Sequence, residues 1–247
     1  MNQAVFNQIY QECQQISPYL KGEFTDAESE SNSELELISA NRSNITIIKS
    51  LHTSLMQQSP EAGRSYWLTR SWDLLTWQPL YLTLTSIYQL RILPDLNNML
   101  QQHDNGLVAG FRFNCTDCAT GDYECLIRQA GKQLSQLFEH YRKELDQWAR
   151  CRPRFTEHLI ADALFAKLLL MQKSHPEMSD SFIRRHAKLW LDALNFSDSH
   201  LQSLCLSKLD NKLSLNRTSC CCVYKTTAGV KCANCPRLKQ KSKSCTN

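Results

Sequence analysis

The chain of 247 residues has 42% hydrophobic and 21% charged residues and a net charge of +4, so it is a globular protein long enough to bury a substantial core. Its seven glycines and seven prolines are few for this length, which favours long helices over a turn-rich β architecture. The sequence shows neither a secretory signal nor a run of about 18 apolar residues, so we expect a protein of the reducing cytoplasm. In that compartment its twelve cysteines would bind metal or lie buried rather than form disulfides.

The first segments of the chain predict two helices separated by a linker. Residues 2–17 place apolar side chains at helical spacing, and a proline follows them. Residues 25–36 are acidic and serine-rich, which is typical of a solvated loop or linker. Ser43 or Asn44 can cap a helix through residues 45–57, and a proline closes it.

Residues 64–93 contain a concentration of aromatic side chains. Pro79 lies between two apolar stretches and suits the first turn of a second helix. We expect the rings to pack as a core between two long helices. The alternative is that some of them line a pocket for an organic chelate, to which Arg64 or Arg70 contributes charge. The aromatic residues are Tyr66, Trp67, Trp72, Trp77, Tyr81 and Tyr88.

Residues 106–113 alternate apolar and other side chains between turn signals and are the best candidate for a strand. A C-x2-C-x6-C arrangement of Cys115, Cys118 and Cys125 follows. Three thiols and a histidine would make a structural zinc site, but the nearest histidine, His103, lies twelve residues before Cys115. We therefore expect reduced cysteines at the start of a helix.

The second half of the chain predicts further helices. Residues 122–150 carry a long apolar stripe at helical spacing, and helices are also expected over residues 155–173 and 179–194. Ser197 can cap a short helix that ends near Leu209. The predicted fold is therefore mainly α with a small β element near residues 106–113.

Known nucleotide and hydrolase motifs are missing from the sequence. It has no Gly-rich phosphate loop, no G-x-S-x-G turn and no H-E-x-x-H segment. A bound nicotinamide or flavin is not supported, so electrons of nicotinamide origin would have to come from a separate donor.

Cysteines gather in the segment of residues 219–237, which we call the cysteine loop. Five of them lie within sixteen residues, and Cys232-x-x-Cys235 is the knuckle in which two thiolates of one tight turn reach the same metal. Four convergent thiolates suit either zinc or an iron–sulfur cluster. The five are Cys220, Cys221, Cys222, Cys232 and Cys235.

The adjacent cysteines at the start of the loop favour a binuclear centre. Neighbouring side chains of an extended strand point to opposite faces, so Cys220 and Cys221 can both bind metal only if the backbone turns irregularly or the centre is large. A [2Fe–2S] cluster is larger than a zinc ion. A second register, with Cys221 and Cys222 as ligands, would leave nine residues before Cys232.

Positive charge is concentrated on the same segment. Residues 211–247 contain eight Lys or Arg and no Asp or Glu, whereas residues 1–210 hold 20 basic and 24 acidic residues. A [2Fe–2S] centre on four thiolates carries a formal charge of about −2, which nearby cations would stabilise. The alternative is a solvated basic tail. The basic residues are Lys212, Arg217, Lys225, Lys231, Arg237, Lys239, Lys241 and Lys243.

The loop resembles the C-terminal signature of FhuF-type ferric-siderophore reductases, which carry a [2Fe–2S] cluster on C-C-x10-C-x2-C. The likeness includes Tyr224 and Gly229 inside the loop and Pro236 after it. It covers residues 217–236 and is loose over the preceding helices. The ligands that the resemblance implies are Cys220, Cys221, Cys232 and Cys235. Cys222 departs from the family pattern by adding a third adjacent thiol, and the first register is preferred because it reproduces the family spacing.

The resemblance implies a helical body, residues 1–210, that docks a ferric siderophore of the hydroxamate type beside a C-terminal [2Fe–2S] segment, residues 211–247. An external donor such as a ferredoxin or a reduced nicotinamide would supply one electron, and the basic segment could touch the inner face of the cytoplasmic membrane. No nucleic acid is expected. Candidate residues for contact with the chelate are Arg217, Tyr224, Lys225 and Lys231.

Two other interpretations remain at this stage. The four cysteines could hold zinc in a helical adaptor that contacts nucleic acid or protein, with the basic tail on phosphates. Alternatively, the chain could be a relative of siderophore-biosynthesis proteins, in which the cysteine motif would have no role.

Overall fold

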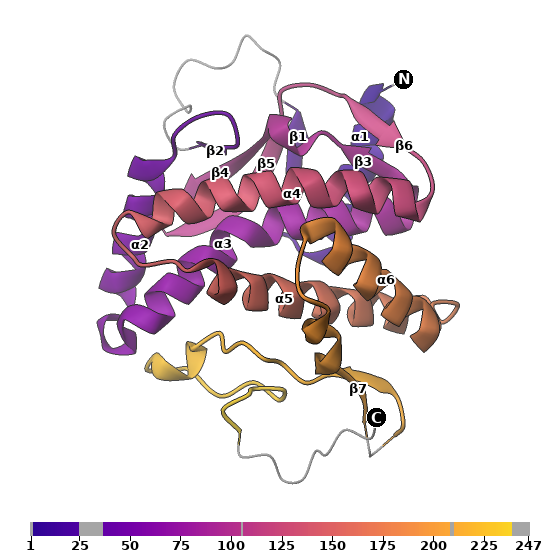
Figure 1. The fold of residues 1–247 in the computed structure, drawn as a ribbon. Helices are drawn as coiled ribbons and strands as arrows, with labels where there is room; N and C mark the ends of the chain where they lie inside the picture. The colour runs from indigo at the N-terminus through magenta and orange to yellow at the C-terminus, as the bar shows by residue number, and fades with distance from the viewer. Residues whose placement is uncertain (1, 25–36, 105, 208–209, 239–247) are drawn as a thin grey trace.

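A computed structural model describes residues 2–24, 37–104, 106–207 and 210–238. In it, long helices form the body of the protein, a sheet covers one side, and the C-terminal segment lies on the opposite side beyond α5 (Figure 1). The predicted linker at residues 25–36 lies outside the described residues. The helices are α1 (Asn2–Ile16), α2 (Ile45–Gln58), α3 (Gly63–Thr85), α4 (Tyr123–Asp146), α5 (Pro153–Ser174) and α6 (Asp180–Leu194).

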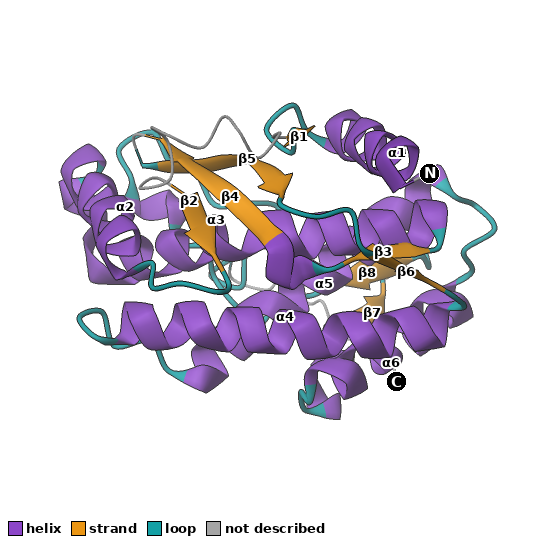
Figure 2. Ribbon diagram, turned by 90° about the horizontal axis from the view of Figure 1, so that it is seen from above, coloured by secondary structure: helices purple, strands orange, loops and turns teal. Residues whose placement is uncertain are grey.

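The sheet is larger than the sequence predicted. Its strands run in the order β1-β5-β4-β2, with β5 antiparallel to β4 and parallel to β1. The strand expected at residues 106–113 is confirmed as β5, whereas β1 and β2 have only three residues each, too few for an alternation to show. Seen from above, the sheet lies over α3, between α2 and α1 (Figure 2). The bounds are β1 (Gly22–Phe24), β2 (Leu37–Ser39), β4 (Met99–Asp104) and β5 (Leu107–Phe113).

Two short antiparallel pairs of strands complete the β structure. β3 (Ile92–Pro94) pairs with β6 (Cys118–Thr120), and β7 (Leu204–Leu206) pairs with β8 (Leu213–Leu215). The domain boundary that we expected at residue 210 falls in the turn between β7 and β8, directly before the basic segment. The protein is mainly helical with a small β component, as the sequence predicted.

Helix α3 corrects one prediction. Pro79 does not start a second helix; it lies inside one continuous helix, which a short π-helical turn, Ser86–Leu90, extends. A proline inside a helix leaves the carbonyl four residues earlier without its N–H partner. Here that carbonyl belongs to Leu75, and the buried side chain of Gln101 donates to it at 3.0 Å. Gln101, on β4, therefore replaces the missing hydrogen bond, which the sequence of the helix alone cannot show.

The segment after α6 corrects a second prediction. Ser197 does cap a short helix, but this is a 3-10 helix over Asp198–Ser203 rather than one that continues to Leu209. The chain turns into β7 instead, because pairing with β8 buries Leu204 against the body together with Leu213. Both ends of α6 behave as expected, since Ser179 accepts the N–H of Phe182 at 3.2 Å.

The aromatic residues of α3 divide between core and surface hollows. Trp72 and Tyr88 are buried, in agreement with the expectation of a packed core. Trp67, Trp77 and Tyr81 are only partly buried, pack against the core and line hollows at the surface. The expectation of a packed core therefore holds for Trp72 and Tyr88, whereas a chelate pocket at the other rings stays a prediction.

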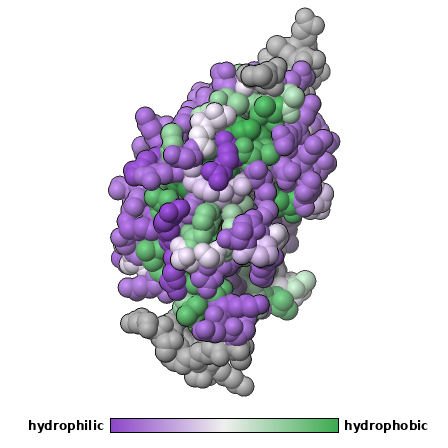
Figure 3. Space-filling view, turned by 90° about the vertical axis from the view of Figure 1, so that its right-hand side faces the viewer, coloured by the Kyte–Doolittle hydropathy of each residue, from purple (hydrophilic) through white to green (hydrophobic). Residues whose placement is uncertain are grey.

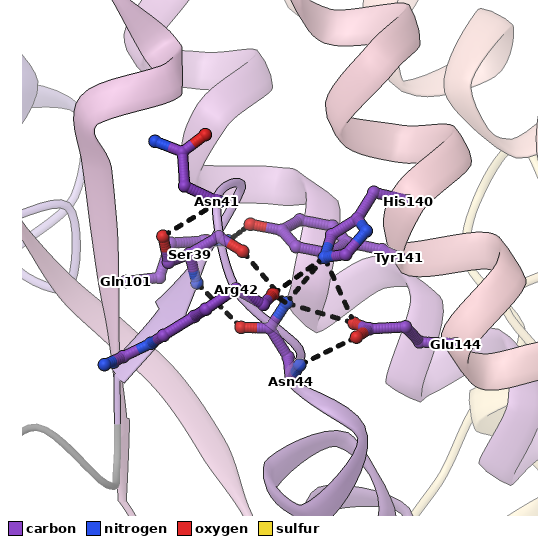
Figure 4. A network of polar contacts seen from close by, with 8 residues as sticks. All are labelled: Ser39, Asn41, Arg42, Asn44, Gln101, His140, Tyr141 and Glu144. Carbon is purple, nitrogen blue, oxygen red and sulfur yellow. Dashed lines mark hydrogen bonds and ion pairs between the residues drawn. The ribbon is translucent and has the colours of Figure 1, made fainter.

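Asn44 joins the sheet to the helices (Figure 4). Its backbone N–H and side-chain amide both donate to the buried carboxylate of Glu144 on α4, at 2.7 and 3.0 Å. Its side-chain oxygen accepts the N–H of Ser39 on β2 at 2.8 Å instead of capping α2. Asn44 thus satisfies polar groups of β2 and α4, which would cost about 1–3 kcal/mol each if left unpaired.

Close contact between α4 and α6 completes the body. A Cβ atom on Gly131 would lie 2.5 Å from the Cβ of Ala193, so only glycine permits the two helices to approach this closely. On the face at the right of Figure 1, hydrophobic side chains form patches interrupted by hydrophilic ones (Figure 3). None of the helices in the described part of the chain is both long and apolar enough to cross a membrane.

His186 on α6 is buried without a charge partner. Its ring stacks on Phe182 at 3.9 Å between centroids, and its Nδ1 accepts the hydroxyl of Tyr88 at 2.8 Å, while Trp190 donates to the same hydroxyl. Burial lowers the pKa of His186 from 6.5 to about 4, assisted by the charges of Arg185 and Arg91. The folded protein therefore holds a neutral imidazole at this position.

We expect His186 to make the protein less stable as the pH falls from 6.5 towards 4. In that window the unfolded chain binds a proton on His186 and the folded chain does not, so the free energy of unfolding decreases. The loss between pH 7 and pH 5 should be about 1–2 kcal/mol. Urea unfolding at both pH values should show a smaller loss for His186→Phe than for the wild type and an unchanged loss for His175→Gln. An equal loss in the wild type and His186→Phe would contradict this assignment.

Candidate metal centre

Asp162 on α5 anchors the chain where it enters the cysteine loop. Its carboxylate, only 2% exposed, accepts the backbone N–H and the hydroxyl of Ser219 at 2.7 and 2.5 Å and the N–H of Thr218 at 3.0 Å. The Arg217 guanidinium lies 3.8 Å from the same carboxylate. A buried carboxylate needs such partners, because an unpaired charge in the interior is strongly disfavoured. Asp162 thus sets the position of Cys220.

The far side of the cysteine loop is held at the start of α3. Glu61 accepts the N–H and the hydroxyl of Thr227 at 2.8 and 2.9 Å, and Lys225 donates to the Ser65 hydroxyl at 2.5 Å. Within the loop, a Cβ atom on Gly229 would lie 1.8 Å from the carbonyl oxygen of Val223. Glycine is therefore required for the loop to fold back on itself.

The adjacent pair of thiols lies close to the two thiols of the knuckle. Cys235 shares hydrogen bonds with Cys220 and Cys232, and the charge of Cys221 acts on Cys232. A tight turn closes the knuckle, since the Cys235 N–H donates to the Cys232 carbonyl at 3.0 Å. The segment 220–222 has no regular structure, so the adjacent side chains are not forced to opposite faces. The structure thus gathers the four thiols in one place.

The pKa values of the four thiols are shifted in different directions. Burial opposes the charge on Cys235, but the backbone N–H of Arg237 and the thiols of Cys220 and Cys232 together lower its pKa. Burial raises the pKa of Cys220 to about 11, and burial followed by the nearby Cys221 raises that of Cys232. Since the thiolate is the form in which cysteine binds metals, Cys235 is the thiol whose surroundings best support binding.

Cys222 has a different environment from the four. Its backbone is left-handed, with φ at 59°, and its buried thiol points back to the Cys220 carbonyl, with 3.6 Å between sulfur and oxygen. Cys222 also influences the pKa of Cys220, both through a backbone hydrogen bond and through its charge. The register with Cys220 and Cys221 as ligands stays a prediction.

Cys118 and Cys125 lie in regular elements near the middle of the chain. Cys118 lies in β6 and Cys125 in the first turn of α4, where its backbone N–H donates to the capping carboxylate of Asp122 at 2.8 Å. Among the described residues, no three Cys, His, Asp or Glu side chains stand in the geometry of a bound metal ion, in the cysteine loop or elsewhere. In the loop the donors are close together as thiols, not arranged around a common point.

A hollow of about 380 Å³ lies between α3, α5 and the cysteine loop. Cys221, Arg217 and Asn234 of the C-terminal segment line one side of it, and Asp73 and Tyr81 of α3 line the other. Burial raises the pKa of Asp73 to about 6, against the opposing influence of Arg70 and Arg217. Asp73 and Asp162 escaped the sequence analysis because each is a single acidic residue within an apolar helical pattern, far along the chain from the cysteines.

The structure distributes the predicted substrate residues unevenly. Arg217 lies at the hollow beside Asp162, whereas Lys225 is engaged with Ser65. The Lys231 ammonium lies 5.8 Å above the Tyr224 ring and donates to the Arg237 carbonyl at 3.3 Å. The last three lysines of the basic segment, Lys239, Lys241 and Lys243, lie outside the described residues.

Comparison with known proteins leaves the site to be interpreted from its chemistry. The chain matches no protein-family model, and no solved structure matches its fold. The described residues present a thiol-rich loop held on the helical body at Thr218 and Ser219 and again at Lys225 and Thr227, with Arg217 and Lys231 near its thiols. A set of clustered cysteines is a donor set that suits metal binding.

We expect the Asp162→Ala variant to loosen the loop at its first anchor. Removal of the carboxylate leaves the N–H groups of Thr218 and Ser219 without their acceptor, so hydrogen exchange at these amides should be roughly 10- to 100-fold faster. Exchange measured by mass spectrometry should be unchanged in Asp192→Ala, whose carboxylate binds only the exposed Lys188. Unaltered exchange at Ser219 in the Asp162 variant would show that the anchor does not exist in solution.

Proposed function

We propose that Cys220, Cys221, Cys232 and Cys235 bind a [2Fe–2S] cluster and that the protein is a ferric-siderophore reductase. The observation that carries the proposal is that two adjacent cysteines lie close to the C-x2-C knuckle, with Cys220 hydrogen-bonded to Cys235 and Cys221 near enough to Cys232 for its charge to act on it. A binuclear centre can accommodate two adjacent ligands more readily than one zinc ion. The resemblance of residues 217–236 to FhuF-type reductases supports the substrate class.

The residues around the thiols would serve this role by position and charge. Asp162 holds the start of the loop at Ser219 and Glu61 holds its middle at Thr227, so the loop has two fixed points on the helical body. Arg217 and Lys231 place positive charge near the sulfurs, which favours an anionic group there. A [2Fe–2S] group bound by four thiolates accepts and passes on one electron at a time.

The reaction requires no covalent step. One electron converts each chelated Fe(III) to Fe(II). A ferredoxin would supply electrons singly, whereas one reduced nicotinamide would supply two electrons, release one proton and so reduce two ferric ions. Hydroxamate oxygens hold the hard ferric ion tightly and the ferrous ion far more weakly, so reduction releases the metal without destroying the chelator. Cys221 and Cys232 are partly exposed, which leaves their side of the loop open to a docked chelate.

The proposed surroundings follow from the same charge. We place the protein in the cytoplasm, where the basic residues 211–247 could meet an acidic donor protein, an anionic chelate or the inner face of the membrane. No nucleic-acid partner is proposed.

We expect purified protein to be red-brown and to contain iron and acid-labile sulfide in equal amounts. After reduction with dithionite it should give a rhombic S = 1/2 EPR signal. Cys232→Ser should lose the colour, whereas Cys222→Ser and the control Cys125→Ser, in the first turn of α4, should retain it. Colourless protein with stoichiometric zinc would instead favour the adaptor, and loss of colour in Cys222→Ser would mean that the other register is correct.

Electron transfer to the substrate has a separate expected outcome. Dithionite-reduced protein, freed from excess reductant and mixed anaerobically with a ferric trihydroxamate, should release about one Fe(II) per protein, because the centre stores one electron. A chromogenic ferrous chelator measures the product, and Cys125→Ser should behave like the wild type. If air oxidises the reduced protein but the ferric chelate does not, the reductase proposal is disproved and the cluster proposal stands.

A further inference from the structure

A second and larger hollow lies at the ends of α2, α3 and α4, away from the thiols. It encloses about 600 Å³, within the range of roughly 300–1,000 Å³ that is usual for small-molecule sites. We call it the cationic cleft. The residues that define it are Lys49, Arg64, Trp67, Trp148 and Arg150, with His52 and Met56.

The charge of the cationic cleft is of one sign. Lys49, Arg64 and Arg150 line it from three different segments, and no carboxylate is among its lining residues. In the described part of the chain none of these three forms an ion pair. His52 adds no charge at neutral pH, because burial lowers its pKa and its Nδ1 is hydrogen-bonded to Ser71 at 3.0 Å. Like charges gathered around a hollow repel one another unless an anion occupies it.

The walls of the cationic cleft are aromatic. The Trp67 ring is fixed by its N–H, which donates to the Ser59 carbonyl at 2.8 Å. The Trp148 ring also lines the cleft and packs against the hydrophobic core, which limits its movement. Two indole rings also offer flat faces on which a planar ligand can stack.

We propose that the cationic cleft binds an anionic small molecule with a planar aromatic part. The anion would lie among Arg64, Arg150 and Lys49, and the ring between Trp67 and Trp148. The inference does not depend on the cluster. The two features are nevertheless neighbours, because the hydroxyl of Ser65, which lines the cleft, accepts a hydrogen bond from the Lys225 ammonium of the cysteine loop. A concave hollow of this size suits a compact ligand better than a polymer.

Three probes test the proposal by calorimetric titration of the full chain. Naphthalene-2-sulfonate has both the ring and the charge, naphthalene-2-sulfonamide has the ring alone, and methanesulfonate has the charge alone. We expect the first to bind once per chain and about tenfold more tightly than either of the others, because hydrogen bonds to a charged group are worth at least that factor. Equal affinity for the sulfonate and the sulfonamide, or binding at many sites, would overturn the proposal.

Variants then locate the binding. Arg64→Gln and Arg150→Gln change exposed side chains, so both should fold, and each should weaken naphthalene-2-sulfonate about five- to tenfold. Trp148→Phe should weaken it less, because the ring remains and only the N–H is lost. Arg184→Gln, on an exposed position of α6, is the matched control and should bind like the wild type. Unchanged affinity in both cleft arginine variants would place the ligand elsewhere and disprove the assignment.

Discussion

The buried carboxylate of Asp162 is the interaction on which the C-terminal part of the protein depends. It lies on α5, in the middle of the chain, and it receives three hydrogen bonds from Thr218 and Ser219 immediately before the first cysteine of the loop. A buried carboxylate is stable only when hydrogen bonds compensate for the water that it loses, and these donors provide that compensation. The start of the loop is therefore fixed to the helical body with little freedom, although it has no regular secondary structure.

Buried polar contacts of this kind also occur at other points where the elements of the body meet. Gln101 on β4 replaces the hydrogen bond that Pro79 removes from α3, and Asn44 links β2 to Glu144 on α4. In each case one buried polar side chain satisfies backbone or carboxylate groups that are remote in sequence. Buried polar groups of this kind are costly when unpaired, so they define how the sheet is seated on the helices. The rigid layer that results carries the anchors of the cysteine loop.

Two neighbouring features of the surface share a positive charge. The cysteine loop has Arg217 and Lys231 near its sulfurs, and the cationic cleft has three cations of its own. The contact between Lys225 and Ser65 joins the two. Positive potential over adjacent regions attracts anions to this side of the molecule whatever their identity. In the proposed ferric-siderophore reductase, this potential would attract both an anionic iron chelate and an acidic electron donor.

The helices and the strand β5 were predictable because apolar periodicity and capping residues are local, and the clustering of the C-terminal thiols was predictable because their spacing along the chain is short. The continuity of α3 through Pro79, the partners of β5 and the turn into β7 were not, because each depends on contacts with distant segments. The roles of Asp162 and Asp73 likewise escaped notice, since an isolated acidic residue in an amphipathic helix looks like a solvated one until the fold buries it. Sequence thus determined the long helices, the strand β5 and the gathering of the C-terminal cysteines, which depend on local patterns, and tertiary structure alone decided which polar groups lose water and must find partners.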